Sequence, residues 1–261
     1  MQLTVCCETL FTDRPLAERF AAVRALGVEG VELWGLPPEN VAAVEDGLRS
    51  AGCRLHLFCG NRDHSLIDPD ERAGFLAELR QSLAHATRLG CSHLTILSDK
   101  VDAQGIPIPP ARPLTNEQKA DSMLEGLKQA AALAEAANIT LLLEPLNTRV
   151  DHPGYTLAHS REAFDIVQRI GNPRLKVLYD VYHMQIMEGN LIATIDANLS
   201  DIGHIHVADV PGRHEPGTGE IDYGSIAHLL RAKGYDRAVG LECFPRDSSE
   251  AAVEVFREMF C

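Results

Sequence analysis

The chain has 261 residues, 45% of them hydrophobic, and a formal net charge of −13 at pH 7. A length of about 250 residues is typical of one α/β barrel, so we expect a single domain over residues 1–261. The negative charge disfavours nucleic acids and anionic membranes as partners. The sequence contains no run of about 18 apolar residues, so no membrane span is expected. The charge does not forbid an anionic substrate, because a local metal ion or arginine can override the overall field.

The cysteines indicate a reducing environment. There are seven, an odd number, and no pair has the spacing of a zinc site, which is typical of buried thiols in the cytoplasm. Cys59 and Cys243 are the candidates for a catalytic thiol, but no motif pairs either with a histidine. The start MQLTVCCETLF has no basic region before its apolar stretch, so we interpret it as a strand rather than a signal peptide. A cytoplasmic protein is predicted.

Short apolar runs alternate with amphipathic stretches along the whole chain. The first amphipathic stretch is expected to begin at Thr12 or Asp13, with Pro15 near its first helical position. The apolar runs read as eight strands, at residues 3–7, 28–34, 54–58, 93–97, 139–143, 175–179, 202–207 and 238–242.

Glycines mark the ends of the predicted helices. Glycine allows the left-handed backbone conformation that often ends a helix, and one stands shortly before a strand at five places: Gly27, Gly52, Gly90, Gly171 and Gly234. Eight strands and eight helices in series imply a parallel sheet with right-handed crossovers, and closure into a (β/α)8 TIM barrel is predicted. The alternative is an open doubly wound sheet, which usually has a glycine-rich loop after its first strand; CCETLFTDRP has no glycine.

One segment between the predicted fourth strand and the next helix is long and irregular. Residues 99–114, DKVDAQGIPIPPARPL, contain prolines that exclude a helix. Loops of this length often act as lids or contact partners.

An acid or a histidine closes four consecutive apolar runs: ITLLLE, LKVLYD, IGHIH and AVGLE end at Glu144, Asp180, His206 and Glu242. In a closed parallel barrel, these side chains would converge at the carboxyl end of the strands, where the chemistry of such barrels takes place. Three carboxylates and an imidazole at one point would repel unless a cation lay between them. We therefore predict a divalent metal site, for Mn²⁺, Mg²⁺, Co²⁺ or Zn²⁺.

The same set fits a proton-transfer reaction. Glu144 and Glu242 could serve as base and acid on opposite sides of a substrate, while the metal stabilises an enediolate oxygen. The alternative is that each residue is a separate charge at the edge of the core.

Four further residues are candidates for binding the substrate. His183 follows Asp180 by three residues. Arg213 stands on a loop rich in glycine and proline. This loop could hold its guanidinium over the carboxyl end of the barrel, where it could bind a carboxylate or hydroxyls with two hydrogen bonds. His56 alternates with leucines in the third strand, and Trp34 ends the second. The structural alternatives are a buried histidine for His183 and His56, a surface salt bridge for Arg213 and simple packing for Trp34.

Several long motifs resemble one enzyme family. The segments LEPLNTRVDHPGYTL, LYDVYHMQIMEGN, IGHIHVADVPGRHEPGTGEIDY and GLECFP are similar to those of the hydroxypyruvate isomerase family, within the xylose-isomerase-like superfamily of sugar isomerases and epimerases. The resemblance covers nearly the whole chain and is densest from about 139 to 245. It implies a TIM barrel whose metal is held by the four strand-end residues.

The resemblance also implies roles for single residues. Glu144 and Glu242 would carry the proton transfer, and His183 and Arg213 match positions that bind substrate oxygens in related ketose epimerases. His206 stands where hydroxypyruvate isomerases have glutamine, which makes the site similar to that of the ketose 3-epimerases. Relatives are often dimers or tetramers, so a homo-oligomer is a further expectation.

These observations predict a metal-dependent isomerase that converts a small hydroxy-carbonyl compound through an enediolate, as in the conversion of hydroxypyruvate to tartronate semialdehyde. A ketose 3-epimerase is the first alternative, in which the proton returns to the same carbon. The others are a metal-dependent lyase of the inosose dehydratase type and a barrel that binds a ligand without catalysis.

Overall fold

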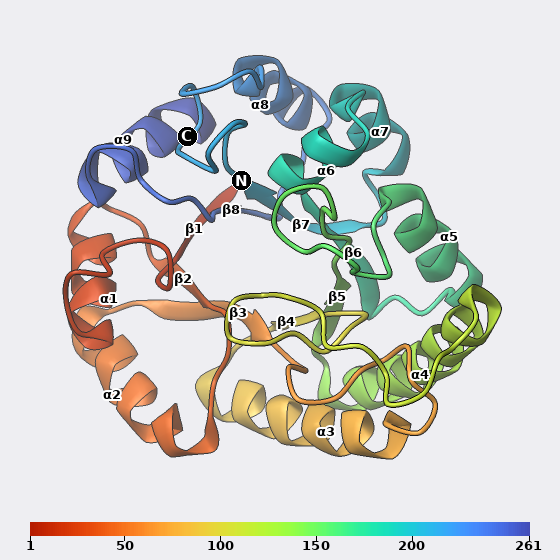
Figure 1. Ribbon diagram of the computed structural model, residues 1–261. Helices are drawn as coiled ribbons and strands as arrows, with labels where there is room; N and C mark the ends of the chain where they lie inside the picture. Colours follow the sequence, from red (N-terminus) through yellow and green to blue (C-terminus); the bar gives the residue numbers. More distant parts are fainter.

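Eight parallel strands form a closed barrel in the order in which they occur along the chain. The computed structural model describes residues 1–261 and confirms the predicted (β/α)8 architecture (Figure 1). The strands are β1 (Gln2–Cys6), β2 (Gly30–Leu33), β3 (Arg54–Cys59), β4 (His93–Ile96), β5 (Thr140–Leu143), β6 (Leu175–Asp180), β7 (Ile202–Val207) and β8 (Ala238–Leu241).

The helices surround this barrel (Figure 1). They are α1 (Leu16–Ala25), α2 (Val41–Ala51), α3 (Arg72–Leu89), α4 (Asn116–Ala137), α5 (Ser160–Ile170), α6 (Val181–Met187), α7 (Leu191–Asn198), α8 (Tyr223–Ala232) and α9 (Ser249–Phe260), with a short 3₁₀ helix at Pro38–Asn40. None of them is both long enough and apolar enough to cross a membrane.

The structure has one helix more than expected, because two helices follow β6. Gly189 and Asn190 lie between α6 and α7 with φ angles of +67° and +50°. A left-handed backbone ends a right-handed helix, so the chain turns there and α7 starts in a new direction.

The predicted helix ends are confirmed. Gly52, Gly90 and Gly171 cap α2, α3 and α5 in the left-handed conformation, and the glycines after α1 and α8 also have positive φ. The predicted start of the first helix was wrong. Pro15 has a ψ of 150° and caps the helix, which therefore begins at Leu16 instead of Thr12 or Asp13.

Two apolar clusters stabilise the barrel. The larger contains 66 buried residues contributed by both the strands and the surrounding helices. A separate cluster joins Leu57, Leu142 and Leu178. Because side chains alternate along a strand, Leu178 lies on the same face of β6 as Asp180, which reaches the carboxyl end of the barrel.

The segment 99–114 forms a loop between β4 and α4, as predicted. Val101 and Pro107 form a bridge within it, and its Gly105 carbonyl oxygen lies 2.6 Å from His152 Nδ1. The loop passes in front of β3 and β4 in Figure 1. Residues of this loop line the cavity at the carboxyl end of the barrel.

The apolar cluster inside the barrel gives a stability prediction. Leu178→Ala removes a fully buried side chain, so we expect the free energy of unfolding to fall by about 2–5 kcal/mol, through lost apolar transfer and the cavity left behind. Urea denaturation measures this change. Val255→Ala, at a position in α9 that is 37% exposed, is the control, and a loss for Leu178→Ala no larger than that of the control would contradict the assignment.

Candidate active site

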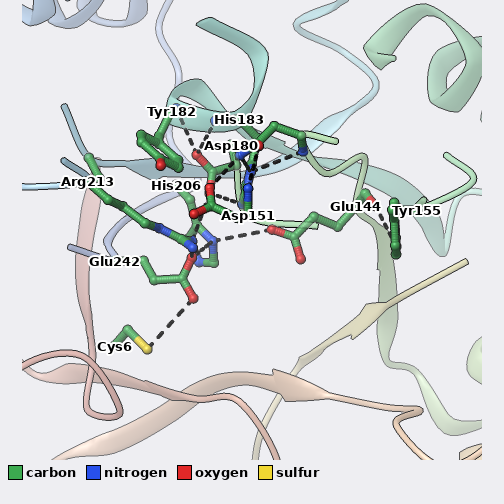
Figure 2. A network of polar contacts seen from close by, with 12 residues as sticks. Cys6, Glu144, Asp151, Tyr155, Asp180, Tyr182, His183, His206, Arg213 and Glu242 are labelled. Atoms are coloured by element: carbon green, nitrogen blue, oxygen red, sulfur yellow. Dashed lines mark hydrogen bonds and ion pairs between the residues drawn. The ribbon is translucent and has the colours of Figure 1, made fainter. Parts of the chain in front are cut away.

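The four residues predicted at strand ends meet at the carboxyl end of the barrel. Glu144, Asp180, His206 and Glu242 are all buried, and each contributes a potential ligand atom within 4.8 Å of the others. Figure 2 shows them converging from neighbouring parts of the sheet. The expectation that parallel strands would bring these side chains together is confirmed.

Backbone structure fixes where each carboxylate lies. Asp180 is the last residue of β6 and caps α6, since its Oδ1 accepts hydrogen bonds from the backbone N–H groups of Tyr182 and His183 at 2.8 and 3.3 Å. Glu144 and Glu242 directly follow β5 and β8, and their own N–H groups continue the sheet ladder. The carboxylates are therefore held by the sheet itself.

His206 lies between the two glutamates. Its Nδ1 is 3.5 Å from Glu242 Oε2 and 3.8 Å from Glu144 Oε1, and no hydrogen-bond partner satisfies this atom. The other ring nitrogen, Nε2, lies 2.7 Å from Glu32 Oε2. His206 thus connects the strand-end carboxylates to a fourth carboxylate inside the barrel.

Arg213 reaches the site from the loop after β7. It hydrogen-bonds to Glu242, lies 3.6 Å from Asp180 Oδ2, and stacks over the Tyr182 ring at 5.1 Å. Its side chain is only 11% exposed, which excludes the alternative of a surface salt bridge. The residue itself has a φ of +55°, and the contacts of its guanidinium offset that backbone strain.

His183 and Trp34 also line the cavity. His183 Nδ1 accepts the Asn147 N–H at 3.2 Å, so its Nε2 carries the proton and faces Asp180 Oδ2 at 3.5 Å. Trp34 donates its indole N–H to Glu242 Oε1. Both residues predicted to bind substrate therefore have a polar hydrogen beside the carboxylates.

His56 is not brought to the cavity. It stacks on His93 with ring centroids 4.6 Å apart and lines a hollow at the opposite, amino-terminal end of the barrel. The register between β2 and β3 shifts after Val31, so His56 has no partner on β2 and Leu57 takes the place that lines the cavity. The expected alternation fails at this irregularity.

The cavity above the strand ends has a volume of about 450 Å³. Val101, Ala103, Gln104 and Gly105 contribute to its wall, so the loop 99–114 takes part in the site. The wall also includes further residues that the sequence did not single out: Glu8, Arg62, His152 and Phe244. Burial raises the pKa of Glu8 to about 8.

The strand-end carboxyl groups differ in acidity. Burial raises the pKa of Glu144 and raises that of Asp180 to about 7. Burial acts on Glu242 in the same direction, but Arg213 and His206 outweigh it and hold the pKa of Glu242 below its usual value. Opposite shifts in neighbouring carboxyl groups are typical of acid–base pairs.

The donors fit a divalent cation. Three carboxylates and one imidazole supply only oxygen and nitrogen, the ligands favoured by Mn²⁺, Mg²⁺, Co²⁺ and Zn²⁺. The unsatisfied Nδ1 of His206 points toward Glu144 and Glu242. Burial alone would lower the pKa of His206, but Glu32 and Glu242 raise it well above its usual value, as expected where a cation is needed.

The sequence did not reveal Glu32, Thr4 or His204, which lie directly below the site. Glu32 Oε1 accepts the Thr4 hydroxyl and lies 2.8 Å from His204 Nε2. The sequence did contain one sign of a role for Glu32. A carboxylate within a strand that is buried on both faces needs a hydrogen-bonding or charged partner. His204 and His206 are two residues apart in β7 and so share one face.

The xylose isomerase-like TIM barrel model matches residues 20–259. Among curated relatives, a hydroxypyruvate isomerase of Escherichia coli K12 is 34% identical over 252 residues, which cover 94% of this chain and 93% of that protein. A 2-oxo-tetronate isomerase of Cupriavidus necator is 31% identical over 253 residues, with the same coverage of 94% and 93%.

Solved structures show the same fold. A protein described as AP endonuclease, family 2, from Brucella melitensis has a TM-score of 0.88 and 28% identity, and the match covers 98% of both chains. The D-psicose 3-epimerase of Clostridium cellulolyticum H10, solved with D-tagatose, has a TM-score of 0.83 and 20% identity over 100% of this chain and 99% of that chain.

The comparisons confirm the predicted family and the predicted class of enzyme, an isomerase. The chain belongs to the xylose isomerase-like TIM barrel family, and its relatives above 30% identity include hydroxypyruvate and 2-oxo-tetronate isomerases.

Proposed function

We propose that this protein is a metal-dependent isomerase that interconverts small hydroxy-carbonyl acids through an enediolate, as in the conversion of hydroxypyruvate to tartronate semialdehyde. One observation carries the proposal: Glu144 and Glu242 approach His206 Nδ1 from two sides, with opposite pKa shifts (Figure 2). The isomerase names of two relatives support the reaction class.

A divalent ion would be held by Glu144, Asp180, His206 and Glu242. When bound, it would polarise the substrate carbonyl and neutralise the negative charge that develops on its oxygen. The donor set admits Mn²⁺, Mg²⁺, Co²⁺ or Zn²⁺, all of which accept oxygen and nitrogen ligands.

The two glutamates divide the proton transfer. Glu242, which Arg213 and His206 keep ionised, removes the proton from the carbon that bears the hydroxyl group. Glu144, whose pKa is raised by burial, delivers a proton to the neighbouring carbon. The hydroxyl proton passes to the former carbonyl oxygen, so atoms and electrons balance within the substrate and no redox cofactor is needed.

Other cavity residues would orient the substrate. Arg213 and Arg62 bring two guanidinium groups to the cavity wall, and a guanidinium binds a carboxylate with two parallel hydrogen bonds. The Nε2–H of His183 and the indole of Trp34 lie beside the carboxylates, where they would contact substrate oxygens. His56, predicted to join them, lies at the opposite end of the barrel.

The cavity volume supports a second candidate, a ketose 3-epimerase. About 450 Å³ leaves room beyond a three-carbon acid, since pockets of this size accept much larger ligands. A longer ketose would use the same glutamates, with the proton returned to its original carbon from the opposite face. An inosose-type dehydratase would instead release water.

We also propose a cellular location and an assembly state for the enzyme. All seven cysteines are free thiols, which supports a reducing cytoplasm. The chain would act as one domain over residues 1–261, on a small-molecule substrate and without nucleic acid, and could assemble as a homodimer or homotetramer, as expected from its relatives.

Metal removal tests the first part of the proposal. We expect EDTA to abolish turnover of hydroxypyruvate and Mn²⁺, Mg²⁺ or Co²⁺ to restore it, because four buried donors hold the ion that stabilises the developing charge. Activity is measured after dialysis, with metal content checked by elemental analysis. A metal-free preparation with full activity would refute metal dependence.

Deuterium exchange tests the proton transfer. In D₂O, Glu242→Gln should stop exchange at the carbon next to the carbonyl and lower kcat by about 10² to 10⁴-fold, since loss of general base catalysis costs that much. NMR with hydroxypyruvate, erythrulose, tagatose and fructose locates the deuterium. Deuterium on the neighbouring carbon would indicate isomerisation, and deuterium on the original carbon would indicate epimerisation. A dehydrated product would indicate a lyase.

Glu188→Gln is a matched control for this experiment. Glu188 caps α5 by accepting hydrogen bonds from Ser160 and does not line the cavity, so this variant should exchange at the wild-type rate. Exchange by Glu242→Gln at the same rate as Glu188→Gln would remove Glu242 from the proton transfer.

Metal affinity should depend on pH. The metal-free protein holds protons on Asp180, with a pKa of about 7, and on His206, whose pKa is raised well above its usual value. A bound metal requires both groups deprotonated, so protons compete with it below those pKa values. Calorimetric titration with Mn²⁺ should give at least about tenfold tighter binding at pH 8 than at pH 6. Equal affinity at both pH values would contradict the assigned ligands.

A further inference from the structure

Glu32 is a carboxylate buried inside the barrel, where it is only 2% exposed. No lysine or arginine pairs with it. The charged group beside it is His206, and His204, whose pKa is lowered by burial, also lies in contact with it. A carboxylate so placed is costly unless both of its oxygens are satisfied. Its contacts therefore indicate what it does.

The two oxygens of Glu32 have different partners. Oε1 accepts the Thr4 hydroxyl and lies 2.8 Å from His204 Nε2. Oε2 lies 2.7 Å from His206 Nε2. The Thr4 hydroxyl thus fixes one oxygen, with the His204 ring packed beside it, and the other oxygen faces His206.

Gly240 of β8 shows how closely this group is packed. A Cβ atom built on Gly240 would lie 2.6 Å from Glu32 Oε1, 2.8 Å from His204 Nε2 and 2.9 Å from His206 Cδ2. Such distances are far inside van der Waals contact, so only glycine leaves room for the three side chains. The backbone of β8 supports their arrangement.

This arrangement determines which nitrogen of His206 is available. Nε2 faces an oxygen that can only accept, so Nε2 carries a hydrogen. Nδ1 then faces Glu144 and Glu242 at 3.8 and 3.5 Å, without a hydrogen-bond partner. Among metal sites in general, such a carboxylate behind a ligating histidine fixes the ring and strengthens binding.

We infer that Glu32 is a positioning residue, which holds His206 with Nε2 protonated and Nδ1 directed into the metal site, and that the Thr4 hydroxyl in turn holds Glu32. The inference rests on the metal site of the proposed function, but not on which substrate or reaction that site serves.

Metal affinity measured without substrate tests this role. Glu32→Gln keeps the shape of the side chain but removes its charge and one of its two acceptors. We expect Mn²⁺ to bind about 10 to 100-fold more weakly by calorimetric titration, and saturating Mn²⁺ to restore most of kcat. Asp68→Asn, which changes another carboxylate that is 2% exposed and lies outside the cavity, should bind Mn²⁺ as the wild type does.

Thr4→Val gives a test that does not depend on the stability of Glu32→Gln. Valine keeps the shape of the side chain and replaces the hydroxyl that holds Oε1 with a methyl group. We therefore expect a smaller loss of Mn²⁺ affinity, about fivefold, because one hydrogen bond is lost. Thermal unfolding of both metal-free variants shows whether they fold. Wild-type Mn²⁺ affinity in a folded Glu32→Gln or Thr4→Val would overturn the positioning role alone. No Mn²⁺ binding by the wild type would overturn the metal site as well.

Discussion

Compensation of negative charge inside the barrel is the constraint on which the site depends. Glu32, Glu144, Asp180 and Glu242 are buried within the barrel and at its carboxyl end, where each isolated ionised group would be strongly disfavoured. The sheet fixes their backbone positions, so they cannot move apart. Arg213 and His206 are the cationic groups in contact with them, and a divalent ion would complete the balance.

The same constraint makes the pKa values of Glu144 and Glu242 differ. Arg213 bonds to Glu242 but not to Glu144, so burial dominates at Glu144 and the guanidinium dominates at Glu242. Arg213 is held in turn by the Tyr182 ring and by a loop with positive φ at Gly212 and Arg213. Arg213 is not one of the proposed metal ligands, yet its contact with Glu242 decides which carboxyl group holds a proton.

Much of the fold and the convergent site could be predicted because they follow from periodic features. Alternating strands and helices with glycine ends indicate a parallel barrel, and parallel strands bring their carboxyl ends together. Glu144, Asp180, His206 and Glu242 could be identified because each ends an apolar run. Their roles are a further inference from chemistry and resemblance.

The residues that could not be predicted have positions set by local irregularities of the backbone or by contacts between strands that are distant in the sequence. His56 was misplaced because the register shift between β2 and β3 interrupts the alternation. Glu32 lies in the middle of a strand, and its partners Thr4 and His204 come from β1 and β7, which nothing in the sequence links to it. The division of α6 from α7 arises from two left-handed residues, of which Asn190 is not a glycine.

We propose that buried donors from four strand ends hold one divalent ion. Anomalous diffraction from crystals soaked in Mn²⁺ tests it most directly, because the signal locates the ion without reference to activity. We expect one peak per chain, bounded by His206 Nδ1 and by oxygens of Glu144, Asp180 and Glu242. No peak there, or a peak between Glu32 and His204 instead, would contradict it.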